Sequence, residues 1–100
     1  MKIQTESIQF KADAKLVSRI ENKLNKLDRL FDRIIEAHVK LKLENSGKVK
    51  DKIMEVHLKV PNQTLTSGAT EKTFESALDQ VEDSLKRQLI KYKERLRNHS

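Results

Sequence analysis

Apolar residues alternate with polar ones, or recur every three to four positions, in six successive segments of the chain. Alternation predicts a strand with one buried face, whereas the longer period predicts an amphipathic helix. Residues 2–10 form the first predicted strand, and its apolar phase shifts between Ile3 and Ile8, so we expect a bulge or an early end there. The first helix follows, with Asp13 as its N-cap. Its apolar stripe consists of Leu16, Ile20, Leu24, Leu27 and Phe31.

The middle of the chain is predicted to form three strands. Alternation over residues 37–43 and 54–60, with a polar turn at residues 45–47 between them, indicates a hairpin. Pro61 and Asn62 end its second strand, and residues 63–69 supply a shorter strand with small inward side chains. The outward positions of the hairpin are polar, so this face of the sheet is expected to stay in solvent. These positions are Lys40, Lys42, Glu55, His57 and Lys59.

A long helix is predicted from Thr73 to Arg97, with Thr70 or Thr73 as its cap and with Leu85 and Leu89 in the core. Acidic residues occupy its first half and basic residues its second half, the polarity that the helix dipole favours. The dipole needs only one or two cations in the last turn, and further cations repel one another. A bound polyanion would offset that repulsion. The six cations are Lys86, Arg87, Lys91, Lys93, Arg95 and Arg97.

These elements define a fold class. A strand-helix-strand crossover is almost always right-handed, so the first two strands pair in parallel, and the later strands meander antiparallel. One apolar sheet face and two apolar helix stripes are best buried when both helices lie on the same side of the sheet. We therefore predict an α+β fold, a two-layer β-α-β-β-β-α sandwich with a four-stranded mixed sheet, similar to double-stranded RNA-binding domains. A length of 100 residues leaves room for one domain.

The charge balance favours an anionic partner. The chain has 21 Lys and Arg residues against 15 Asp and Glu residues, a formal net charge of +6. Charge is also sorted around the first helix, where Glu21, Asp28 and Asp32 share one flank. The opposite sector contains Lys15, Arg19, Asn22, Lys26, Arg29 and Arg33, with Lys23 at its edge.

Few residues point to chemistry or to another compartment. The chain contains no cysteine, which excludes disulfides and thiolate metal sites, and neither a leader pattern nor a membrane span is present, so a cytoplasmic protein is expected. No phosphate-binding glycine loop or hydrolase motif occurs, so neither an enzyme nor a cofactor is predicted. His38 and His57 count to near-opposite positions of the hairpin and could share a metal with Glu55 or Glu36, but two imidazoles do not define a site. The four aromatic residues occupy core positions, which argues against a stacking platform for unpaired bases.

Three segments resemble one known family. Residues 27–34 and 39–44, and above all residues 85–96 with Arg87, Gln88, Leu89, Lys91 and Lys93 at their motif positions, are similar to the ribosome hibernation promoting factor and ribosome-associated inhibitor family. Residues 23–27 also resemble the first helix of that family. One departure is residues 73–75, where many members have an aspartate, a hydrophobic residue and a tyrosine.

The resemblance implies a function. Family members bind the small ribosomal subunit in the channel for messenger and transfer RNA, inhibit translation under stress or in stationary phase, and catalyse no reaction. It also implies that residues 1–100 are a single ribosome-binding domain of the short form, without the C-terminal dimerisation domain of long members. The expected contacts to ribosomal RNA follow from the family's motif positions, except for Lys86 and Arg95, which are included on charge alone. They are Lys23, Lys26, Lys86, Arg87, Lys91, Lys93 and Arg95.

The expected partners are the small subunit and its RNA, with a paired ribosome or a second hibernation factor as further candidates. No membrane and no small-molecule substrate is expected. Two other classes of function stay open: a free-standing double-stranded RNA-binding protein, and a protein-interaction adaptor that uses the acidic flank of Glu21, Asp28 and Asp32.

Overall fold

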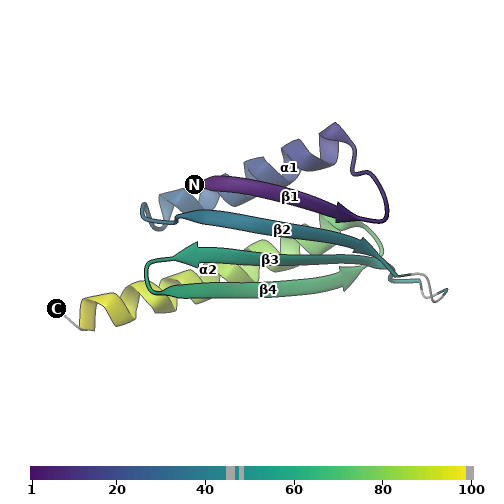
Figure 1. Cartoon of the computed structure of the whole chain (residues 1–100). Coiled ribbons are helices and arrows are strands. Elements are labelled where there is room, and N and C mark those ends of the chain that lie inside the picture. Colours follow the sequence, from purple (N-terminus) through teal and green to yellow (C-terminus); the bar gives the residue numbers. More distant parts are fainter. Residues whose placement is uncertain (45–46, 48, 99–100) are drawn as a thin grey trace.

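A computed structural model describes residues 1–44, 47 and 49–98. Its four strands form one sheet in the order β1-β2-β3-β4, in which β1 pairs with β2 in parallel and the other neighbours are antiparallel (Figure 1). This architecture confirms the predicted α+β class with a four-stranded mixed sheet. The elements are β1 (Lys2–Ile8), α1 (Ala14–Asn25), the 3₁₀ helix η1 (Lys26–Arg29), β2 (Glu36–Leu43), β3 (Lys52–Val60), β4 (Gln63–Glu71) and α2 (Phe74–Asn98).

Both helices cover the same face of the sheet, and both begin at the same end of it (Figure 1). Phe10, after β1, stacks on Phe74 at the start of α2 with 5.6 Å between the ring centroids. The core lies between the layers, and the predicted core residues Leu85 and Leu89 are fully buried there. They pack in one cluster with the inward side chains of the sheet, among them Val56.

The other sheet face is open to solvent. Register places Glu36 opposite Lys59 and Lys40 opposite Glu55, while the inward-facing Val39 lies opposite Val56. Three of the five positions expected in solvent are exposed, and Lys40 and His57 are half-buried. Cross-strand pairs of opposite charge are favourable neighbours, which is how this face carries charge without a second layer.

The first helix is shorter than its periodicity predicted. It ends at Asn25, and the chain tightens into η1, where the backbone N–H groups of Leu30 and Phe31 both reach the carbonyl of Leu27, at 3.0 and 3.2 Å. The tighter turn buries Leu27 and Phe31 while it redirects the chain toward β2. The periodicity therefore predicted the inward side of this segment, where all but the half-buried Leu16 are buried, but not the residue at which the helix ends.

The ends of the elements mostly follow expectation. β1 ends early, at Ile8, as its phase shift predicted, before Gln9 with a φ of 63°, whereas β4 is longer than predicted and extends to Glu71. Thr73, and not Thr70, caps α2, because its Oγ1 accepts from the Ser76 N–H at 3.1 Å. Asp13 caps α1 in the same way at 2.8 Å from the Leu16 nitrogen. The predicted turn at residues 45–47 lies mostly outside the described residues.

Candidate nucleic-acid interface

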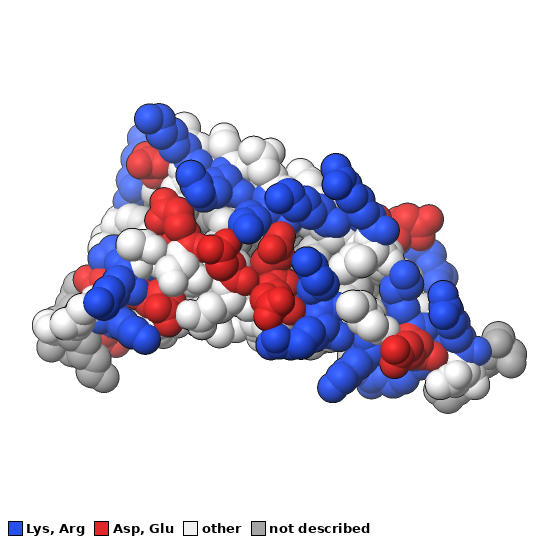
Figure 2. All heavy atoms as spheres, turned by 180° about the vertical axis from the view of Figure 1, so that it is seen from behind, with Lys and Arg blue, Asp and Glu red and all other residues white. Residues whose placement is uncertain are grey.

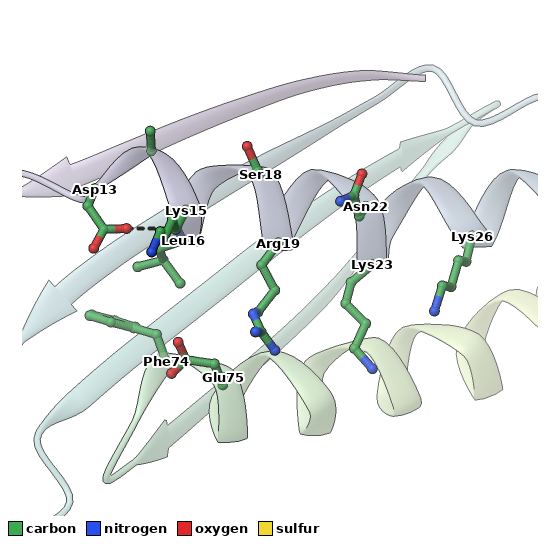
Figure 3. A pocket seen from close by; sticks show the side chains of 11 residues that line it. Asp13, Lys15, Leu16, Ser18, Arg19, Asn22, Lys23, Lys26, Phe74 and Glu75 are labelled. Atoms are coloured by element: carbon green, nitrogen blue, oxygen red, sulfur yellow. Dashed lines mark hydrogen bonds between the residues drawn. The ribbon is translucent and has the colours of Figure 1, made fainter.

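The basic side of α1 faces a groove next to α2. The groove has a volume of about 910 Å³ and runs from the start of both helices along α1. Arg19 and Lys23 extend from α1 toward α2, as does Lys26 from the start of η1, and Glu75 lies at the start of α2 on the other side (Figure 3). Burial of Ile20 fixes the opposite side of α1 in the core, and this rotation is what sends the basic sector into the groove.

Lys23 bridges the two helices. Its Nζ lies 3.0 Å from Asp79 Oδ1 and 3.7 Å from Glu82 Oε1, both on α2. The hydrogen bond that Lys23 donates to Asp79 and the negative charge of Glu82 raise the pKa of Lys23 above its ordinary value of 10.5. The structure thus gives Lys23, which we predicted as an RNA contact, a role in joining α1 to α2.

The cations of α2 are spread over more than one flank of the helix. At about 100° per residue, Lys86 and Lys93 lie on the flank of Glu82, which is the side toward α1. Arg87 lies near the middle of the solvent-exposed side of α2, and its Nη1 is 2.6 Å from Asp83 Oδ2. These cations can therefore approach a ligand that lies over both helices.

The remaining two predicted cations lie on the opposite flank. Lys91 and Arg95 share the side of Gln88, whose Nε2 donates to the carbonyl of Thr66 on β4 at 3.0 Å. The seven predicted residues thus do not form one flat patch. Five of them surround the exposed half of α2, while Lys23 on α1 and Lys26 at the start of η1 line the groove.

An acidic cluster separates the basic row of α1 from the basic half of α2. Figure 2 shows a row of basic side chains along α1, acidic side chains beside it in the middle of the face, and further basic side chains toward the C-terminal part of α2. The acidic cluster consists of Glu75, Asp79, Glu82 and Asp83. A polyanion therefore finds favourable charge along α1 and over the second half of α2, and an unfavourable region between them near the first half of α2.

The two basic regions meet at the far end of the helices, a feature that the sequence prediction missed. A second hollow, of about 380 Å³, lies where the last turns of α2 pass η1 and the loop after it. Arg29 and Arg33 line it from one side and Lys93 from the other. Arg29 and Arg33 belonged to the basic sector predicted for the first helix, but only the fold brings them next to α2.

The histidines of the open sheet face lie directly opposite each other, His38 beside His57. Each already has a carboxylate neighbour: His57 Nε2 is 2.5 Å from Glu55 Oε1, and His38 Nε2 is 3.4 Å from Glu6 Oε2. Among residues 1–44, 47 and 49–98, no group of three or more His, Asp and Glu side chains is placed to hold a metal ion. In the same part of the chain neither helix is long and apolar enough to cross a membrane.

Solved structures share this fold. A ribosomal subunit interface protein from Coxiella burnetii matches with a TM-score of 0.83 and 25% sequence identity, over 93% of this chain and 98% of that chain. The N-terminal domain of Protein Y from Thermus thermophilus matches with a TM-score of 0.78 and 24% identity, over 92% of this chain and 99% of that chain. No curated protein matches the chain. The fold and the basic helices thus define a small α+β domain of the class seen in these two structures.

The family is shown by the sequence itself. The model of the sigma 54 modulation protein / S30EA ribosomal protein family matches residues 3–97, and the chain belongs to this family. The match, together with the two solved structures, confirms the resemblance to the ribosome hibernation factors.

Proposed function

We propose that this chain is a ribosome hibernation factor. In this proposal it binds the small ribosomal subunit in the channel for messenger and transfer RNA and inhibits translation under stress or in stationary phase. The observation that best supports the proposal is the positive charge that the helix face concentrates along α1 and over the second half of α2, in a chain of the S30EA family. Family membership and the likeness to a ribosomal subunit interface protein support the ribosome as the partner.

Binding is proposed to rest on phosphate contacts. Lysine and arginine side chains that neutralise phosphates release counterions, which gives affinity without base recognition. Lys23 lies between two carboxylates of the other helix, Asp79 and Glu82, so we assign it to the helix-helix contact rather than to RNA. Arg87 differs, because its one partner, Asp83, is exposed on the same helix. The proposed phosphate contacts are Lys26, Lys86, Arg87, Lys91, Lys93 and Arg95.

Inhibition is proposed to be steric, with no bond made or broken by the chain. A domain that fills the channel excludes messenger and transfer RNA, and this needs only affinity and shape. The proposed site of action is the cytoplasm, with residues 1–100 as the ribosome-binding unit. A paired ribosome or a second hibernation factor are further partners consistent with this role.

Competition on purified ribosomes tests the proposal. The chain is sedimented with small subunits alone, with small subunits that carry messenger and initiator transfer RNA, and with naked double-stranded RNA at physiological salt. We expect co-sedimentation with empty subunits and a strong loss when the channel is occupied. Equal binding to filled and empty subunits would overturn the channel site, and equally tight binding to the naked duplex would favour a free-standing RNA-binding protein.

The adaptor alternative is weakened by one contact. Of the three acidic residues proposed for it, Asp28 is already used, since its Oδ2 lies 3.1 Å from the amino group of Met1. Only Glu21 and Asp32 remain exposed on that flank. Treatment of a cell lysate with RNase separates the two functions, because a protein-only partner would stay bound after the RNA is digested.

A further inference from the structure

The hollow between the end of α2 and the η1 segment combines cations with apolar surface. Arg29, Arg33 and Lys93 surround it, and the half-buried Leu30 and the partly exposed Leu96 contribute apolar lining. A site that takes only phosphate needs no apolar lining. The composition instead suits a ligand with an anionic group and a flat, weakly polar part.

Arg33 is held in an unusual way for a cation of this face. Its guanidinium carbon lies 5.1 Å from the centroid of the Phe31 ring, so it is positioned by an aromatic ring. Phe31 is itself only 6% exposed and meets the ring of Tyr92 edge-on, at 90° and 5.3 Å between centroids. The Tyr92 hydroxyl donates to the Pro61 carbonyl at 2.7 Å, which fixes that ring in turn.

This arrangement provides a stacking surface. The guanidinium carbon of Arg33 lies over the Phe31 ring, and Arg33 is exposed and lines the hollow, so its guanidinium is accessible to a ligand there. Unpaired bases stack on arginine guanidinium planes as well as on aromatic rings. The burial of all four aromatic residues argued against base stacking when only the sequence was considered. The structure changes this conclusion, because the buried Phe31 supports an exposed planar cation.

We propose that this hollow binds one unpaired nucleotide of an RNA, with its base against the Arg33 guanidinium and its phosphate near Lys93 and Arg29. The proposal rests on the proposed function and deepens it, because it adds a base contact to a site otherwise made of phosphate contacts. Two carboxylates also line the hollow: Asp28 lies beside the Met1 amino group, and Asp32 is exposed. A carboxylate accepts hydrogen bonds from a ribose hydroxyl or a base amino group, both of which a nucleotide offers and a bare phosphate lacks.

An arginine-to-lysine exchange separates stacking from charge. Arg33→Lys keeps the positive charge and removes the planar guanidinium group. We therefore expect a loss of about tenfold in affinity for small ribosomal subunits, with an unchanged slope of log K against log salt. The control is Lys59→Arg, the reverse charge-preserving exchange at an exposed position of the open sheet face, and it should stay within about twofold of wild type. An unchanged affinity for Arg33→Lys would overturn the proposal, and a loss with a reduced slope would make Arg33 a phosphate contact instead.

A second measurement does not depend on the ribosome. Amide chemical shifts of the free chain are followed during titration with adenosine monophosphate and, separately, with inorganic phosphate. Shifts of residues 29–33 and 93–97 with the nucleotide alone, reduced in Arg33→Lys, support the pocket even if ribosome binding fails. Equal shifts with both ligands would overturn the base contact. Ribosome binding that Arg33→Lys leaves intact would overturn the pocket while the proposed function stands.

Discussion

The open sheet face and the helix face are both rich in charge, but they arrange it differently. On the sheet, Lys40 lies between Glu6 on β1 and Glu55 on β3, while Glu36 lies between Lys2 and Lys59. Cross-strand neighbours are about 5 Å apart, which is less than the Debye length of about 8 Å at physiological salt. The potentials of opposite charges at that spacing largely cancel at the distance of a ligand in solution.

The helix face separates its charges along the chain. The second half of α2 has six cations and a single acidic residue, Glu94, while its first half is acidic. Six charges of one sign over about 16 Å of helix add their potentials instead of cancelling them. A net charge of +6 therefore says little about where an anion binds, and the order of the charges on each surface decides it.

The hydrophobic core lies between the two charged faces, and a substitution there should have the largest effect because both faces depend on it. Leu85→Ala should lower the free energy of unfolding by about 2 to 5 kcal/mol, because a fully buried leucine leaves a cavity that the surroundings fill only in part. Chemical denaturation measures this. Leu96→Ala is the matched control, since Leu96 is 38% exposed and its loss should cost far less. Similar losses in both variants would mean that α2 does not pack as described.

Salt should affect the helix face strongly. If six cations contact phosphates, affinity for small subunits should fall about a thousandfold between 50 and 200 mM monovalent salt. Fluorescence anisotropy of the labelled chain with purified subunits gives the slope of log K against log salt. A constant affinity over this range would contradict a site made of phosphate contacts.

Removal of equal charge from each face sharpens the comparison. Replacement of Lys26, Arg87, Lys91 and Lys93 by Gln should weaken subunit binding by about a hundredfold or more, whereas the same change at four lysines of the sheet should leave it within about threefold. Gln keeps side-chain length and helix propensity, so both variants should fold. Equal losses would show that net charge alone matters. The sheet set is Lys2, Lys40, Lys42 and Lys59.

Lys23 should show the smallest effect, and on stability rather than on binding. Its raised pKa means that the folded state holds the proton more tightly than the unfolded state, so Lys23 stabilises the fold below pH 10.5 and loses this contribution as pH rises through the folded-state value. Lys23→Gln should cost at most about 1 kcal/mol near neutral pH, because the pair is partly exposed. Unfolding of both chains between pH 7 and 11.5 should show the difference shrink above pH 10.5. A greater loss of subunit affinity in Lys23→Gln than in Lys26→Gln would contradict our assignment of the two residues.

The core and the element order could be predicted because they depend on local periodicity. The burial of Leu85 and Leu89 follows from steps of three and four that hold in any straight helix. The angular position of Arg33 could not be obtained in this way, since the helix gives way to η1 after Asn25 and a 3₁₀ turn has about 3.0 residues instead of 3.6.

The charges of the site were visible in the sequence, but their partners were not. Lys23 meets Asp79, which lies far along the chain, only because α1 and α2 pack side by side at a particular rotation (Figure 3). That rotation depends on the packing of both helices against the sheet. The sequence therefore predicts which residues are basic and exposed, and the fold decides which of them are already neutralised.

The last turns of α2 extend past the final buried residue of that helix. Tyr92 is 4% exposed, and residues 93–98 after it are half-buried or exposed as the helix runs beyond the edge of the sheet (Figure 1). With little apolar burial beneath them, these turns should fray, so their amides should exchange hydrogen through local opening long before the amides around Leu85 do. The end of the cationic half should thus be the least stable part of α2. Fixing it against a ligand would cost conformational entropy, and its local opening would let the end of the helix adjust its direction to an irregular RNA surface.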